Sequence, residues 1–215
     1  MDDGRESLAD LIERLGSVTE DDTREWVAES LVEAIPTAVA DCRRNFVDSR
    51  GPDGRQWAPL KWKRPGATAD SPPLVDSGNL VRTIAGEARG SQLILWTGHK
   101  AAFLHQYGDT IVPVNAHYLC IPKTVKAKYA GSPRRYPDTL HPRTNKERTR
   151  GVLLAEGDDP DQPTRDDGMH VAYFLTTGPV VIPAREFLGY SVETVEFILG
   201  LVVDRVVDRW LLGRR

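Results

Sequence analysis

The chain has 215 residues, an apolar share of 40%, a charged share of 27% and a formal net charge of −3. This balance gives no global reason to expect nucleic acid or a membrane as the main partner, and the length suffices for a sizeable core with or without an arm. Cys42 and Cys120 stand far apart, so neither a disulfide scaffold nor a cysteine zinc site is expected.

The first third of the chain is expected to be helical. A stripe from Leu8 to Leu15 predicts a first helix that Gly16 ends. Thr19 and Asp22 have the spacing of an N-cap pair for a second helix, whose apolar stripe continues to residue 46. A proline at position 36 lies inside that stripe, so we expect a kink or a break near residue 35.

The middle of the chain mixes turn-rich loops with short elements. Segment 50–60 is rich in turn residues, and its Trp57 is placed to anchor it on the core or on a neighbour. Segment 61–73 has no periodicity, so we expect a mobile loop. Asp76 or Ser77 is placed to cap a short helix that continues to Ile84. A strand is expected over 92–97, and a short helix over 101–108.

Two blocks of opposite charge follow. The basic block, residues 123–150, holds nine lysines and arginines against two acids, and the acidic block, residues 156–167, holds six acids against one arginine. Apolar runs on both sides of the acidic block predict a long-looped hairpin. The candidate contact residues are Lys123, Lys126, Lys128, Arg134, Arg135, Arg143, Lys146, Arg148 and Arg150 in the basic block, and Glu156, Asp158, Asp159, Asp161, Asp166 and Asp167 in the acidic block.

The two blocks allow two hypotheses. A basic segment with interleaved tyrosines is typical of phosphate contact, so non-specific DNA binding through 123–150 is one of them. The other is a subunit contact, in which the basic block of one copy meets the acidic block of a neighbour.

The last predicted element is a helix over 192–212 that Ser191 caps. Its apolar stripe consists of Val195, Leu199, Val202, Val206 and Trp210. We therefore expect an α+β fold, in which terminal helices pack on a mostly antiparallel sheet. The expected strands are 92–97, 110–114, 152–155, 171–175 and 180–182. The expected organisation is a helical region over 1–48 and an α+β core over 49–215, with an inserted arm at about 123–168.

Catalytic and metal-binding patterns are not evident, and we expect no cofactor. The sequence has no G-x-S-x-G, P-loop or Rossmann motif. His99 and His105 are six residues apart, which is not ligand spacing on a helix. Pro160 interrupts any EF-hand pattern, so we interpret the acidic block as a solvated run, although weak calcium binding stays open. An enzyme built from scattered carboxylates and His105 is a third alternative.

Four segments occur in an order that resembles the Mu-like phage virion morphogenesis (tail completion) family. They are 46–60 with its Pro-Asp-Gly turn, 74–84, 101–108, and 182–191, which reads I-P-A-R-E-F-L-G-Y-S. Phe103 replaces a usual tyrosine-alanine element, and Glu186 stands where a second proline is common. The matching structural residues are Trp57, Gly78, His105, Gly108, Pro183, Arg185, Phe187, Leu188 and Gly189.

The resemblance implies a structural virion protein rather than an enzyme. Such a protein would be of the tail completion or tail terminator type, made in the bacterial host cytoplasm and located in the neck of the particle. It would form a ring, expected to be hexameric, that joins the tail to the head connector, with other neck and tail proteins as partners and no membrane. Genomic DNA would pass through its lumen without sequence-specific contact. The charged blocks lie where the family varies, so the resemblance gives them no role.

Overall fold

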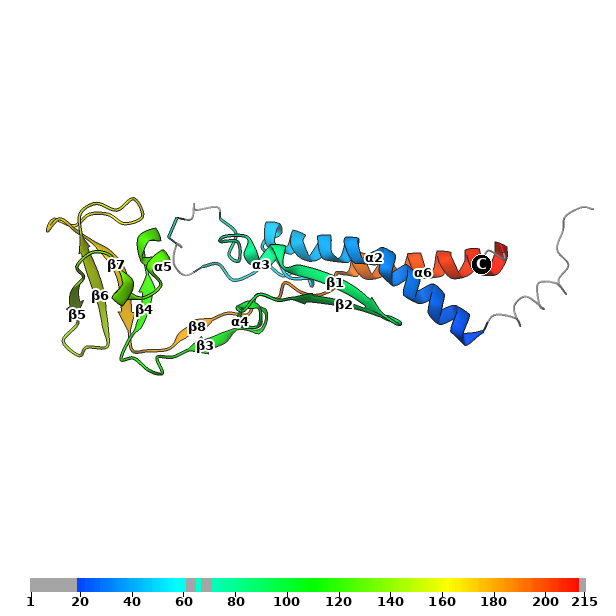
Figure 1. Cartoon of the computed structure of the whole chain (residues 1–215), viewed down its shortest axis with the longest axis horizontal. Helices are drawn as coiled ribbons and strands as arrows, with labels where there is room; N and C mark the ends of the chain where they lie inside the picture. The colour runs from blue at the N-terminus through cyan, green and yellow to red at the C-terminus, as the bar shows by residue number, and fades with distance from the viewer. Residues whose placement is uncertain (1–18, 61–64, 67–70, 213–215) are drawn as a thin grey trace, which may run out of the picture. The chain divides into compact units, whose positions relative to one another are not determined.

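The computed structural model describes residues 19–60, 65–66 and 71–212. The chain has an α+β fold with antiparallel sheets, as predicted (Figure 1). It divides into two compact units. Unit 1 comprises the described chain up to Trp57, Ser77–Ala102 and the described chain from Arg185 onward, and unit 2 comprises Ala58–Asp76 and Phe103–Ala184. The helix expected over 8–15 and most of the loop expected over 61–73 lie outside the described residues.

Unit 1 is built on helix α2 (Glu20–Asp48). Its predicted cap is confirmed: the Asp22 amide donates to the Thr19 hydroxyl at 3.1 Å, and the Thr19 amide donates to the Asp22 carboxylate at 3.0 Å. The helix runs through Pro36 without a break and bends along its length (Figure 1). Ala34 and Ala38, on either side of the proline, are fully buried, and a bend without a break is one of the two outcomes expected where a proline lies inside a helix.

A β-hairpin packs on α2. Its strands are β1 (Ile84–Arg89) and β2 (Gln92–Thr97), of which the sequence predicts only β2. The helix expected to reach Ile84 is instead the short α3 (Asn79–Arg82), and its N-cap is Gly78 rather than Asp76 or Ser77. Ile84 pairs with Thr97 across the hairpin, and this pairing ends the helix early.

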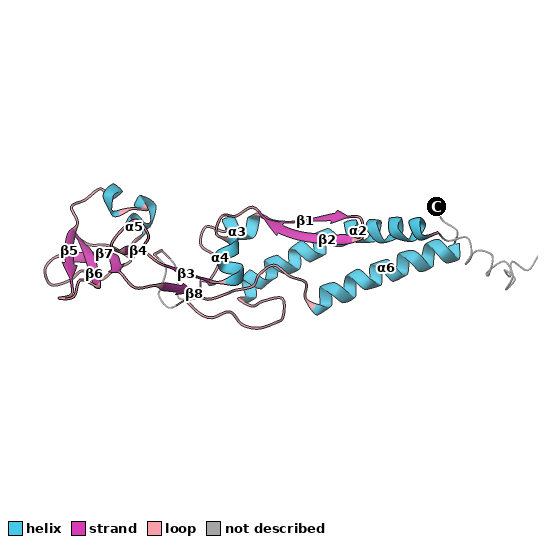
Figure 2. Ribbon diagram, turned by 90° about the horizontal axis from the view of Figure 1, so that it is seen from below, coloured by secondary structure: helices cyan, strands magenta, loops and turns pink. Residues whose placement is uncertain are grey.

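Helix α6 (Val192–Leu212) packs on α2 within unit 1, rather than on a sheet as expected (Figure 2). Its predicted cap is confirmed, since the Thr194 amide donates to the Ser191 hydroxyl at 3.1 Å. The predicted apolar stripe is buried only in part, because Val195 and Leu199 are 42% and 58% exposed. The side that faces α2 carries polar residues such as Thr194 and Arg205, to which α2 presents carboxylates.

Unit 2 contains a four-stranded antiparallel sheet in the order β4-β7-β6-β5 and a two-stranded pair, β3-β8. Strands β6 and β7 form the predicted hairpin around the acidic block, and β8 has its predicted bounds, whereas β3 is shorter than predicted. The elements that follow β2 along the chain, up to the end of β8, are α4 (Ala102–Tyr107), β3 (Asp109–Ile111), β4 (Leu119–Pro122), α5 (Val125–Ala130), the 3-10 turn η1 (Pro133–Arg135), β5 (His141–Thr144), β6 (Arg150–Glu156), β7 (Met169–Thr176) and β8 (Val180–Ile182).

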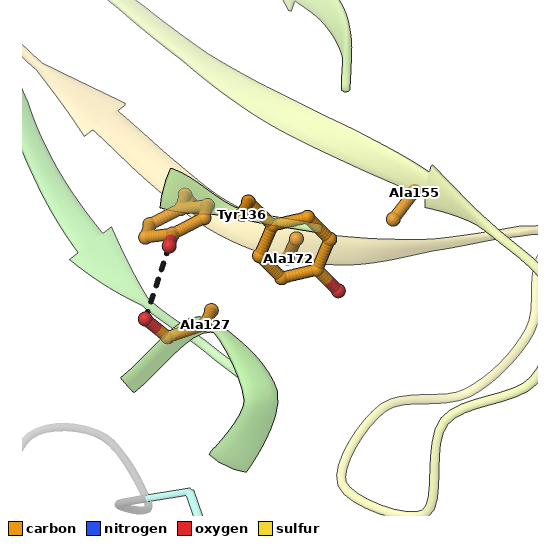
Figure 3. Packing of buried hydrophobic residues seen from close by; sticks show 5 residues of the cluster. Ala127, Tyr136, Ala155 and Ala172 are labelled. Atoms are coloured by element: carbon orange, nitrogen blue, oxygen red, sulfur yellow. Dashed lines mark hydrogen bonds between the residues drawn. The ribbon is translucent and has the colours of Figure 1, made fainter. Parts of the chain in front are cut away.

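The basic block is not an inserted arm, contrary to expectation. It supplies α5, η1 and β5, and two of its residues, Ala127 and Tyr136, belong to the buried core of unit 2. The Tyr173 hydroxyl on β7 donates to the Ala127 carbonyl at 3.0 Å and ties α5 to the sheet (Figure 3). The division expected at residue 48 also differs from the observed units, because α6 and the β1-β2 hairpin cover α2.

Candidate functional site

Residues of unit 1 that carry the family resemblance pack together where the end of α2, the turn-rich segment before Trp57 and the segment before α6 meet. We call this cluster the joint. The Phe46 ring lies 5.5 Å from that of Trp57 and 5.2 Å from that of Phe187, and all three side chains are buried. The Trp57 indole donates to the Glu186 carbonyl at 2.9 Å. Trp57 therefore anchors its turn-rich segment on the core, and its contacts are those of a folding residue.

Helix α2 also binds backbone carbonyls of the same joint. The side-chain amide of Asn45 donates to the Phe187 carbonyl at 3.3 Å, and the Cys42 thiol donates to the Gly189 carbonyl at 3.2 Å. Burial raises the pKa of the Cys42 thiol, which keeps it protonated and poorly nucleophilic. Arg185 is only 4% exposed, and burial lowers its pKa, so it is not a surface arginine.

Asp41 on α2 holds the start of α6. Its carboxylate accepts a hydrogen bond from the Thr194 hydroxyl at 2.7 Å. Burial raises the pKa of Asp41, but hydrogen bonds from Thr194 and Ser191 and the charge of Arg44 lower it, and the net shift is downward. The carboxylate is therefore ionised at neutral pH and fixes the N-terminus of α6 on α2. No sequence pattern singles it out.

The other residues that match the family segments lie in turns or in half-buried positions. Gly108 ends α4 at φ +72° and lies against the backbone of Ile182 and Ala184. Gly78 has φ +76° at the start of α3. The remaining positions are half-buried: His105, Pro183 and Leu188. The family-like residues thus serve packing and turns.

One face of the four-stranded sheet is a candidate binding site. Its residues follow from the strand register, because every second side chain points to the same side. We call this surface the sheet face. One cross-strand row runs through Ile121, Phe174, Val152 and Arg143, and the next runs through Leu119, Thr176 and Arg150.

The sheet face is apolar in its middle and cationic at its rim. It borders a groove of about 640 Å³, whose wall also includes residues 179–181. Arg143 and Arg150 are exposed and make no ion pair with any residue that the structure describes. The Lys123 amine lies 5.0 Å from the centre of the Phe174 ring, and burial lowers its pKa.

The remaining cations of the basic block lie elsewhere. Lys126 pairs with Asp138, and Lys128 pairs with Asp76 at 2.6 Å, so two of the nine are neutralised within unit 2. Two more lie on η1 and two lie between β5 and β6: Arg134, Arg135, Lys146 and Arg148. The strand register thus places Arg143 and Arg150 on the sheet face, and the contact with the Phe174 ring places Lys123 there.

The acidic block is partly used for folding. The Asp161 carboxylate accepts from the amide of Val125 at 2.8 Å, at the start of α5, and from the amide of Gly66 at 3.0 Å. The side chain of Asp159 accepts from the Asp161 amide at 2.9 Å and lies 3.9 Å from the buried His170. The interpretation of this block as a solvated run is wrong for these two residues, because their carboxylates bind backbone amides.

Sequence reasoning misses a second surface. The outward side of α6 exposes an apolar stripe, here called the α6 stripe, with an acidic row beside it. The stripe consists of Val192, Val195, Leu199, Val203 and Val207, and the acidic row consists of Glu193, Glu196, Asp204 and Asp208. The signal is present as helical spacing, but spacing alone does not tell which side of the helix α2 covers.

Within the described residues, no three histidine, cysteine, aspartate or glutamate side chains gather as metal ligands, and no helix has the length and apolarity to cross a bilayer. Comparisons with protein-family models, curated proteins and solved structures give no match to this chain.

Proposed function

We propose that this chain is a structural subunit of a phage particle, of the tail completion type, which assembles into a ring between tail and head connector. The observation that carries the proposal is the α6 stripe. Soluble monomers rarely expose a large contiguous apolar patch, and such patches mark surfaces where proteins associate. Val192, Leu199 and Val203 are 70%, 58% and 57% exposed on one side of one helix.

The joint supports the same proposal. Residues that resemble the family signature, among them Trp57 and Phe187, fix helices and loops to one another. A ring subunit acts by presenting rigid surfaces to its neighbours, and it needs a well-fixed frame for them. The particle location, the six-fold ring and the neck partners rest on the resemblance and form part of the proposal.

Sedimentation of the purified protein tests this function. We expect concentration-dependent assembly, either alone or after addition of tails isolated from particles that lack this protein. Conversion of such tails into infectious particles is the second readout. A protein that remains a monomer in both settings, and never co-sediments with tails, would contradict the proposal.

The sheet face favours a second candidate function, non-specific DNA binding. Cations around an exposed aromatic ring suit a nucleic-acid strand, which offers phosphates and stacking bases. Phe174 is partly exposed, with Lys123 over its ring and two arginines nearby. Fluorescence anisotropy with a labelled oligonucleotide tests this function: affinity should fall steeply with salt and be lost in Arg143→Ala/Arg150→Ala. No binding at low salt would remove this candidate.

A further inference from the structure

We infer that the α6 stripe of one copy docks onto the sheet face of a second copy, so that the chain assembles head to tail. The contact rests on the proposed function, because it is the one by which the subunits of the ring would join. The occupant of each surface is thus a second copy of this chain. Matching apolar centres and opposite charges favour this pairing.

The α6 side offers an anionic and apolar surface. The stripe residues recur every three or four positions from Val192 to Val207, so they line one side of the helix. The acidic row beside them consists of exposed carboxylates. The basic residues Arg205 and Arg209 are turned toward α2, where both contact Glu29. These arginines therefore do not neutralise the outward side.

The sheet face offers a cationic and apolar surface. Its apolar side chains are those of Ile121, Phe174 and Val152, and the exposed Arg143 and Arg150 lie at its rim. The groove beside it adds an apolar wall at residues 179–181. An amphipathic helix that lays its apolar side in such a groove is a common recognition mode. The acidic row would then meet the guanidinium groups at the rim, which fixes the register.

The α6 stripe suits the sheet face better than the acidic block does. Asp159 and Asp161 of that block are already hydrogen-bonded to backbone amides, and the block brings few apolar side chains to fill a groove. Gly200 lies midway along α6, and a Cβ atom added there would meet nothing within 4 Å beyond the backbone of its own helix. No packing within the described residues accounts for a glycine there, whereas close approach of a partner would.

Charge reversal on each surface tests the contact. One variant is Arg143→Glu/Arg150→Glu on the sheet face, and the other is Asp204→Lys/Asp208→Lys on α6. Each alone should weaken self-association by about tenfold or more, because like charges then face each other. The four substitutions combined should restore the wild-type constant to within about threefold.

The matched control is Arg134→Glu/Arg135→Glu. It changes the charge of the same block equally, but these arginines lie on η1, directly before Tyr136, whose ring packs on Tyr173 on the opposite side of the sheet. Self-association of this control should equal that of the wild type. The readout is sedimentation equilibrium over a range of protein concentrations, with circular dichroism to verify folding.

The possible outcomes separate the docking contact from the proposed function. Self-association that survives both reversals overturns the contact and leaves the proposed function standing. A wild-type protein that never associates and never joins tails overturns both. Reversal on the sheet face that abolishes oligonucleotide binding but leaves self-association intact assigns that face to nucleic acid. Single reversals that weaken association without rescue in the combined variant also overturn the pairing of these two surfaces.

Discussion

Asp41 ties together two helices that are far apart in the sequence. It lies on α2 and accepts a hydrogen bond from Thr194 in the first turn of α6. Replacement by asparagine keeps a hydrogen-bond acceptor but removes the charge that this turn stabilises. We expect Asp41→Asn to lower the free energy of unfolding by about 1–2 kcal/mol at neutral pH, measured by urea unfolding.

The pH dependence of this loss follows from the sign of the pKa shift. The pKa of Asp41 is lowered in the folded state, so its contribution is present above the unfolded value of 3.8 and disappears as pH falls through the folded pKa. The two proteins should therefore differ in stability at neutral pH and converge as the pH falls well below 3.8. An equal loss at both ends of this range would show that the carboxylate charge is not what stabilises α6.

Gly108 is a second residue whose identity the structure requires. Its φ is +72°, and a side chain there would come within 2.7 Å of the Ala184 amide nitrogen. Gly108→Ala should destabilise the protein by about 2–4 kcal/mol in thermal unfolding, from the strained backbone and the displaced neighbouring segment together.

A matched control separates the two causes. Gly168 has φ +74°, but nothing lies within 4 Å of the place of its side chain. Gly168→Ala should therefore lower the free energy of unfolding through the strained backbone alone, by about 1 kcal/mol. Equal losses for the two variants would rule out a role for the close approach at Gly108.

At the scale of elements, Phe187 joins segments that sequence order separates. It packs on Phe46 of α2, and its carbonyl accepts a hydrogen bond from Asn45. Phe187→Ala should cost about 3–5 kcal/mol, measured by urea unfolding, because it leaves a cavity in the core. Phe197→Ala on α6, where the ring is 41% exposed, should cost clearly less. Comparable losses would mean that the joint relaxes around the cavity.

The elements also show what can be predicted from the sequence. Caps at Thr19 and Ser191, the β6-β7 hairpin and strands β2 and β8 are predictable because their signals are local. Strands β1, β4 and β5 escape prediction because each contains a glycine or a proline, Gly86, Pro122 and Pro142, and depends on a neighbour for pairing. The candidate site is predictable only as a charged block, because the choice of Arg143 and Arg150 among nine cations requires the strand register.

At the scale of the whole molecule, the two proposed docking surfaces are different and belong to different units. A head-to-tail contact between unlike surfaces is heterologous and produces rings or open chains, whereas two copies that each dock their stripe on the other's sheet face would form a closed two-fold dimer. Each copy then offers one surface of each kind. The wild-type assembly should accordingly contain more than two copies, whereas an isologous contact would stop at two.

Mixing two defective variants tests that arrangement. Arg143→Glu/Arg150→Glu keeps its α6 stripe, and Leu199→Asp/Val203→Asp keeps its sheet face. Each variant alone should remain a monomer at concentrations where the wild type assembles, because one half of every contact is defective. A mixture should form a complex of one copy of each and grow no further, since its two outer surfaces are both defective. Mass photometry of the mixture, beside the larger wild-type assembly, distinguishes this outcome from larger mixed rings, which would contradict a head-to-tail contact.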